Sequence, residues 1–244
     1  MGTSFIQNLT ALASAGLGAL LAISIGVSHR QLCALISFAA GTLLAVTVFH
    51  IIPDAWNVLP ASAIILSLGS GYLLFHLISR YVFHVCPACA ASHFEEQTAA
   101  KFKGMVLLLA IALTVHSVMD GIAITMGGEF ASHGSKPIFL TITFHKLPEG
   151  LALCALLLKA GYDRRNAFWR TLLFETSTLA GWVIGVFLLK GFAENRWLDL
   201  MLIHIGGGFI YLALHATLNE MESHSPRFIF LFFLGGFILM GLIR

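Results

Sequence analysis

The feature that most constrains this chain is a series of apolar stretches about 20 residues long, each suited to cross a bilayer as an α-helix. Only 11% of the residues are charged, whereas soluble domains carry about 25%. We therefore expect an all-α polytopic membrane protein with eight transmembrane helices, forming a single domain over residues 1–244. The predicted spans are approximately Asn8–Ser28, Leu32–Ile52, Ala61–Ser79, Gly104–Gly127, Pro137–Leu158, Thr171–Leu189, Leu198–Leu218 and Phe228–Ile243.

The distribution of basic residues predicts the orientation of the chain, because cytoplasmic loops of membrane proteins are enriched in Lys and Arg. With the N-terminus outside, the inner segments hold nine of the 14 basic residues and the outer segments hold four, with Lys146 inside a span. We therefore predict that both termini face outside. No basic residue precedes Arg30, so the first apolar stretch lacks the positive region of a signal peptide and is expected to be a retained span.

An internal similarity links the second and seventh predicted spans. Gly41–Ala45 opens a stretch that closes at Pro53–Asp54, and Gly207–Tyr211 opens one that closes at Asn219–Glu220. In the predicted topology these acidic ends face opposite sides of the membrane. This pattern is typical of an inverted repeat, which is common in transporters.

Two short polar motifs, referred to below as the polar phrases, interrupt the fourth and fifth spans. His116 and Asp120 are four residues apart, and so are His145 and Glu149. Positions i and i+4 lie on one face of a helix, so each phrase presents an imidazole and a carboxylate together. Counted along antiparallel helices, the four side chains fall in one band about 8 Å thick near the bilayer midplane. They form a ligand set for a divalent metal. A polar network that only joins the two helices is the alternative.

These phrases carry a resemblance to a known family. The sequence His116-Ser117-x-x-Asp120-Gly121-x-Ala123, followed by His145-Lys146-x-Pro148-Glu149-Gly150-x-Ala152, resembles the paired motifs of helices four and five in the ZIP (Zrt/Irt-like) divalent-metal transporters. The likeness extends to the eight spans, the outside termini and the variable inner loop after span three. It implies a 3+2+3 arrangement of helices, import of zinc, iron, manganese or related ions into the cytoplasm, and a homodimer. Mixed imidazole and carboxylate ligands suit cadmium as well.

The resemblance also implies the ligands of a metal site, which would be His116, Asp120, His145 and Glu149. The positions of a second site found in some family members are here Ser117, Lys146, Glu149 and Glu175. A protonated lysine cannot bind a cation, so we predict that its ammonium replaces the second metal, pairs with Glu149 or Glu175, and leaves one metal site. Alternatively, Lys146 snorkels or pairs elsewhere. Glu175 is expected roughly 6 Å from the inner end of a span starting near Thr171.

Other metal-ligating side chains lie near the ends of the spans. His50 and Asp54 are candidates for an entrance relay, and His215, Glu220 and His224 for an exit relay, although a histidine at a helix end is often only an interfacial residue. The cytoplasmic loop at residues 80–103 contains two histidines and two cysteines that could close a zinc site. These are His84, Cys86, Cys89 and His93. A redox pair or plain loop sequence is the alternative.

The leading hypothesis is therefore a transporter of divalent transition metals, zinc foremost, in a plasma (inner) membrane. Its partners are the metal ions and the lipid bilayer, and no organic cofactor is expected. Nucleic acid is not expected either, because the formal charge is only +2. An intramembrane metal-dependent hydrolase is the main alternative, although the chain has no H-E-x-x-H motif. A metal-gated receptor that uses the inner loop as its sensor is a third possibility.

Overall fold

The computed structural model describes residues 2–25, 28–83, 99–129, 135–188, 196–223 and 225–243. In these ranges the regular structure is entirely helical, which confirms the predicted all-α class. Five helical segments are long and apolar enough to cross a membrane, and a sixth, Pro226–Leu242, is a shorter apolar helix. The helices are α1 Gly2–Ser24, α2 His29–Val46, α3 Ile52–Trp56, α4 Ala61–Leu77, α6 Ala99–Glu129, α7 Ser135–Lys159, α8 Arg164–Glu175, α9 Ser177–Val183, α10 Trp197–Ser223 and α11 Pro226–Leu242.

Three π-helical segments extend or join these helices. They are η1 Thr47–Ile51, η2 Ile78–Phe83 and η3 Ile184–Leu188. Segment η1 joins α2 to α3, η2 extends α4, and η3 extends α9. Together with the α-helices, they give eight crossings in the described ranges: α1, α2 to α3, α4 to η2, α6, α7, α8 to η3, α10 and α11. The fold is that of a polytopic all-α membrane protein.

Several helices extend beyond the predicted spans. The sixth crossing begins at Arg164, seven residues before the expected start, because the side chain of Asp163 caps the helix by accepting a hydrogen bond from the backbone N–H of Asn166. Hydrogen bonding from Asn166 also holds the pKa of Asp163 below its usual range. The predicted inner loop at 80–103 is likewise too long, since η2 continues to Phe83 and α6 begins at Ala99. The charged residues at these ends lowered the local hydropathy and concealed the helices.

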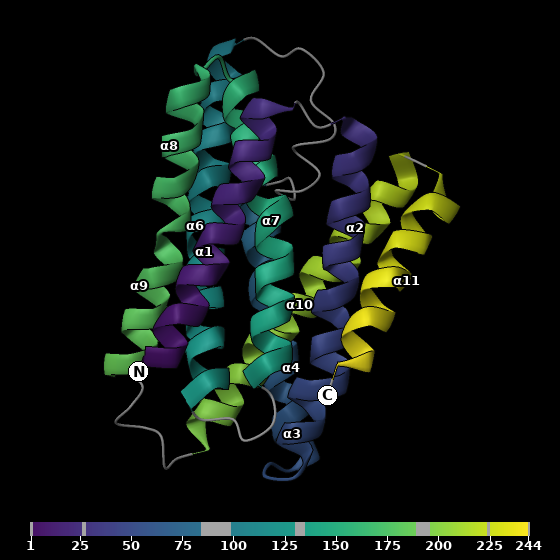
Figure 1. Ribbon diagram of the computed structural model, residues 1–244. Helices are drawn as coiled ribbons and strands as arrows, with labels where there is room; N and C mark the ends of the chain where they lie inside the picture. Colours follow the sequence, from purple (N-terminus) through teal and green to yellow (C-terminus); the bar gives the residue numbers. More distant parts are fainter. Residues whose placement is uncertain are drawn as a thin grey trace.

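The crossings form two bundles that stand side by side (Figure 1). The first bundle contains α1, α6, α7, α8 and α9, and the second contains α2, α3, α4, α10 and α11. The two bundles meet where α2 packs on α7 and where α10 packs on α6. Both chain ends lie at the same end of the molecule, as an even number of crossings requires.

Close contacts between backbones hold each bundle together. In four helix pairs, each helix has a glycine whose Cβ, if present, would lie only 1.8–2.1 Å from a carbonyl oxygen of its partner. Such pairs allow membrane helices to approach closely where lipid supplies no hydrophobic driving force. The glycines are Gly18 and Gly150 for α1 and α7, Gly121 and Gly181 for α6 and α9, Gly41 and Gly236 for α2 and α11, and Gly71 and Gly207 for α4 and α10.

These contacts repeat between the two halves of the chain. The packing of crossing one on crossing five corresponds to the packing of crossing six on crossing four. Likewise, the packing of crossing two on crossing eight corresponds to the packing of crossing seven on crossing three. Gly41 and Gly207, which open the similar stretches in the sequence, occupy equivalent positions in these pairs. This pattern is the one produced when crossings six to eight repeat crossings one to three, with four and five between them.

Candidate metal site

The two polar phrases meet where α6 packs against α7. One donor atom from each of His116, Asp120, His145 and Glu149 can be chosen so that all four lie within 4.8 Å of one another. The Nε2 atom of His145 is 3.2 Å from Oδ2 of Asp120 and 3.7 Å from Oε2 of Glu149. The Nε2 atom of His116 is 3.5 Å and 3.9 Å from the same two oxygens. The i,i+4 spacing in the sequence therefore produces one compact group of two imidazoles and two carboxylates.

Burial and hydrogen bonding orient these side chains. Asp120 is fully buried, and the side chains of His145 and Glu149 are 5% and 6% exposed. The Nδ1 atom of His145 lies 3.2 Å from the carbonyl oxygen of Thr141, one turn earlier on α7. If Nδ1 carries the proton that it donates to this carbonyl, Nε2 remains free to bind a metal. Two further atoms, Nδ1 of His116 and Oδ1 of Asp120, are buried without a hydrogen-bond partner among the described residues.

Lys146 extends the site toward α8. Its side chain is fully buried, so it does not snorkel. The Nζ atom lies 3.1 Å from Asp120, 2.9 Å from Glu149 and 3.0 Å from Glu175, and it donates a hydrogen bond of 2.6 Å to Oγ of Ser117. The Ser117 hydroxyl in turn lies 3.2 Å from both Glu149 and Glu175. One ammonium therefore lies among three carboxylates beside the two imidazoles.

Glu175 lies farther from the start of its crossing than the sequence predicted. It is the last residue of α8, and α9 begins at Ser177. Because α8 begins at Arg164, Glu175 is about 16 Å from the start of its crossing rather than 6 Å. The longer first half of this crossing brings the carboxylate to the level of Lys146, and one of its oxygens, Oε1, is buried without a hydrogen-bond partner in the described part of the chain.

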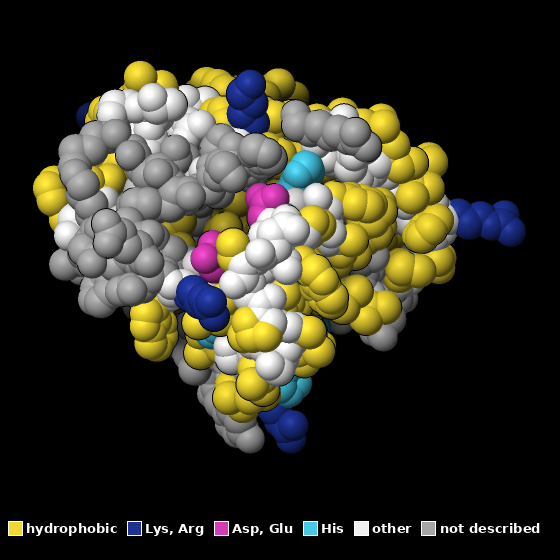
Figure 2. Space-filling view, turned by 90° about the horizontal axis from the view of Figure 1, so that it is seen from below, with side chains coloured by type: hydrophobic (Ala, Val, Ile, Leu, Met, Phe, Trp, Pro, Cys, Tyr) yellow, Lys and Arg dark blue, Asp and Glu magenta, His cyan; other side chains and the backbone are white. Residues whose placement is uncertain are grey.

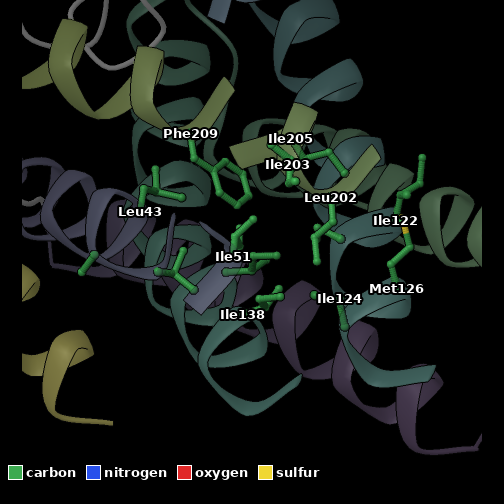
Figure 3. Close-up of a cluster of buried hydrophobic side chains, with 14 of the residues drawn as sticks. Leu43, Ile51, Ile122, Ile124, Met126, Ile138, Leu202, Ile203, Ile205 and Phe209 are labelled. Carbon is green, nitrogen blue, oxygen red and sulfur yellow. The ribbon is translucent and has the colours of Figure 1, made fainter. Parts of the chain in front are cut away.

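A layer of buried apolar side chains gathers from α2, η1, α6, α7 and α10 (Figure 3). The layer contains Leu43, Ile51, Ile122, Ile124, Met126, Ile138, Leu202, Ile203, Ile205 and Phe209. Its members on α6 and α7 lie between the four donors and the end of the molecule that carries the termini. The ring of Phe209 has its centroid 6.4 Å from that of His145. On α6 and α7, buried hydrocarbon therefore lies between the four donors and that end.

The predicted entrance residues lie at the end of the molecule that carries the termini. His50 is half-buried on η1, with Nε2 3.4 Å from the carbonyl oxygen of Met240, and Asp54 is half-buried on α3. Sequence reasoning did not single out Asp199, a half-buried acid in the first turn of α10. Figure 2 shows acidic and histidine side chains near the middle of this face, with hydrophobic, basic and other side chains around them. The structure does not bring any of these residues into the four-donor group.

Fewer of the predicted inner residues can be placed. His215 stacks on Tyr211, with ring centroids 5.2 Å apart, and His76 of α4 approaches the same tyrosine at 6.0 Å. His76 had not been singled out, because it lies near the end of an apolar span and has no carboxylate four residues away. Glu220 is in α10, but its side chain lies outside the described residues, as do His224 and the loop residues His84, Cys86, Cys89 and His93.

Comparisons with known proteins agree with the geometry. An uncharacterized protein of Methanocaldococcus jannaschii is 27% identical, over 93% of this chain and 90% of its own length. The zinc transporter ZupT of Streptococcus mutans is 25% identical, over 98% and 95%, and the zinc transporter YKE4 of Saccharomyces cerevisiae is 24% identical, over 86% and 70%. The family model described as ZIP Zinc transporter matches residues 84–244. Since this match covers more than half of the chain, the protein belongs to the ZIP zinc transporter family.

Proposed function

We propose that this protein carries divalent transition-metal ions, zinc foremost, across a membrane into the cytoplasm, and that it does so through the group His116, Asp120, His145 and Glu149. The observation that carries the proposal is the convergence of four donor atoms within 4.8 Å at the centre of a helical membrane protein. Ionisable groups at that depth are expensive to bury and usually mark a transport pathway. The zinc transporters among the relatives support zinc as the first substrate to test.

The donor set favours transition metals over calcium and magnesium. Imidazole nitrogens suit zinc, iron and similar ions, whereas calcium and magnesium prefer oxygen donors alone. A site with two nitrogens and two carboxylates discriminates weakly among transition metals, so iron, manganese and cadmium are expected substrates as well. Among the described residues, Oδ1 of Asp120 is buried without a hydrogen-bond partner, which is consistent with a carboxylate that gains a partner when a cation binds.

The charges at the site favour one divalent ion. In their usual ionisation states, Asp120, Glu149 and Glu175 carry three negative charges and Lys146 carries one positive charge, which leaves a net charge of two negative units. A single divalent cation neutralises this charge in a medium of low dielectric, where uncompensated charge is costly. A second metal beside Lys146 would bring excess positive charge, so we infer one metal for each chain.

The two-bundle architecture suggests how the metal moves. All four proposed ligands belong to the first bundle, on α6 and α7, while much of the apolar layer comes from the second. Loading from the outside requires this layer to part, and release to the inside requires an opening on the opposite side of the site. We propose His50 and Asp54 as an entrance relay, and His215, Glu220 and His224 as an exit relay. The outside termini and a homodimer in a plasma membrane also remain proposals.

Membership in a family of transporters argues against the hydrolase alternative. The receptor alternative predicts that deleting residues 84–96 abolishes a metal-dependent signal while leaving flux intact. If the loop instead binds metal that leaves the pore, its Cys and His residues should bind zinc when the loop is produced as a peptide.

Zinc uptake into proteoliposomes tests the proposal directly. We expect uptake, read with a trapped fluorescent indicator, to be lost in a His116→Ala/His145→Ala double variant. His204→Ala is the matched control, because His204 bonds to Ser70 at 2.8 Å in the second bundle and is not part of the four-donor group. Uptake at the wild-type rate in the double variant would remove these histidines from the pathway.

A further inference from the structure

We propose that Phe75 is the inner gate of the metal site, an aromatic ring that must move aside for a metal to exchange between the four ligands and the cytoplasmic side. This inference rests on the proposed function and specifies which residue controls release. Phe75 belongs to α4 in the second bundle, whereas the ligands belong to the first. Its ring meets the ring of His116 edge-on, with the centroids 6.3 Å apart and the planes at 89°.

The depth of Phe75 places it on the inner half of the site. Phe75 is about 21 Å from the start of α4, and His116 is about 20 Å from the end of α6, both counted from the end of the molecule that carries the termini. Asp120 is only about 14 Å from that end. Since the members of the apolar layer on α6 and α7 lie between the donors and that end, Phe75 stands on the other side of the group.

The exposure of the donors is consistent with an opening beside His116. The side chain of His116 is 12% exposed, more than any of the other three donors. Two phenyl rings of the second bundle approach the two imidazoles, but the rings differ in burial. Phe209, beside His145, is 2% exposed and belongs to the apolar layer. Phe75, beside His116, is half-buried and does not belong to that layer. Phe75 therefore has more freedom to rotate than Phe209. Beyond it on α4 lies His76, which faces Tyr211 and the proposed exit side.

Gly208 provides the space in which the Phe75 ring rests. A Cβ at residue 208 would lie 2.6 Å from Cε2 of Phe75 and 2.7 Å from Cδ2, distances that real atoms do not tolerate. The bare backbone of α10 at this point thus forms a pocket for the ring. The phenyl ring of Phe75 has no donor atom for the metal and Gly208 has no side chain, so the pair would act on the rate of exchange rather than on the affinity.

Measuring the exchange rate and the affinity separately tests whether Phe75 is a gate. A gate lowers the association and dissociation rates together, so removing it accelerates both and leaves the dissociation constant unchanged. Purified protein loaded with one equivalent of Zn²⁺ is mixed rapidly with an excess of chromophoric chelator, and the dissociation constant is measured separately by competition. We expect Phe75→Ala to release zinc roughly fivefold faster or more, with a dissociation constant within about twofold of the wild-type value.

Two controls separate the gate from a structural effect. Leu74→Ala shortens the neighbouring side chain, which is 41% exposed, and should leave the rate unchanged. Gly208→Ala should change the rate by displacing the ring, and this effect should vanish when Phe75→Ala is combined with it. If Phe75→Ala does not fold, Phe75→Leu serves the same comparison.

The outcomes are distinguishable from a failure of the proposed function. An unchanged release rate in Phe75→Ala, or faster release with proportionally weaker binding, would overturn the gate. So would an effect of Gly208→Ala that persists without the ring. If the wild-type protein binds no zinc, or if His145→Ala binds it with wild-type affinity, the proposed site is wrong whatever Phe75 does.

Discussion

Replacing Lys146 by methionine keeps a long, unbranched side chain at this fully buried position but removes its charge. The ammonium lies 2.9–3.1 Å from carboxylate oxygens of Asp120, Glu149 and Glu175. Without it, three negative groups would face one another in the bundle core. We therefore expect Lys146→Met to destabilise the metal-free protein strongly, and we expect a divalent metal to restore much of the loss by supplying positive charge at the same place.

The size of the effect follows from the burial of these groups. Removing one partner of a buried ion pair costs about 3–5 kcal/mol, because the other partner is left uncompensated. In a protein of this length each kcal/mol lowers the midpoint of thermal unfolding by about 2–4 °C. We therefore expect the midpoint of thermal unfolding to fall by about 10 °C. A metal present at one hundred times its dissociation constant should restore about 2.7 kcal/mol of stability.

Thermal unfolding in detergent, followed by intrinsic fluorescence with and without zinc, measures both quantities. Lys136→Met is the matched control, because Lys136 is exposed near the start of the same helix, and it should unfold like the wild-type protein. An unaltered midpoint in Lys146→Met would show that the carboxylates do not depend on the ammonium. A fall that zinc fails to offset would show that the metal and Lys146 do not share this charge balance.

Three further predictions concern the ligands and the packing. His145→Ala should weaken zinc binding at least about tenfold, measured by competition with a chelator, since it removes a ligand held by a hydrogen bond to Thr141. Zinc uptake at constant free zinc should fall as the pH drops, because protons compete for imidazole nitrogens, and a flat profile from about pH 5 to 8 would exclude titrating ligands in that range. Gly150→Ala should destabilise the protein by about 1–3 kcal/mol, because its Cβ would lie 2.1 Å from the carbonyl oxygen of Ala15. Gly69→Ala, where the added Cβ would meet open space, should not destabilise the protein. Equal unfolding midpoints of the two variants would contradict the close contact.

The sequence was sufficient for the fold class and for the grouping of the four donors. Apolar runs of membrane length predict helices almost regardless of tertiary context. The doubled i,i+4 spacing of His116, Asp120, His145 and Glu149 then needs only two antiparallel neighbouring helices to bring the side chains together. Both are local properties, which explains why they can be read without a structure.

Helix ends and contacts between the two bundles were harder to predict from the sequence. The first two turns of α8 contain Arg164, Arg165 and Arg170, so hydropathy placed the start of this crossing too late and Glu175 too shallow. The contact of Phe75 with His116 depends on how α4 packs against α6, and an apolar residue in an apolar span carries no signal of such a role. The paired glycines were visible one by one, but their partners are set only by three-dimensional packing.

The position of the bound metal tests the central claim most directly. Crystals soaked with cadmium, or separately with zinc, should show one anomalous-scattering peak for each chain, in contact with His116, Asp120, His145 and Glu149 and beside the Lys146 ammonium. The same peak should be lost in His145→Ala. A strong peak elsewhere in the helical core with none among these four residues, or two adjacent peaks in the wild-type protein, would contradict the single-metal site.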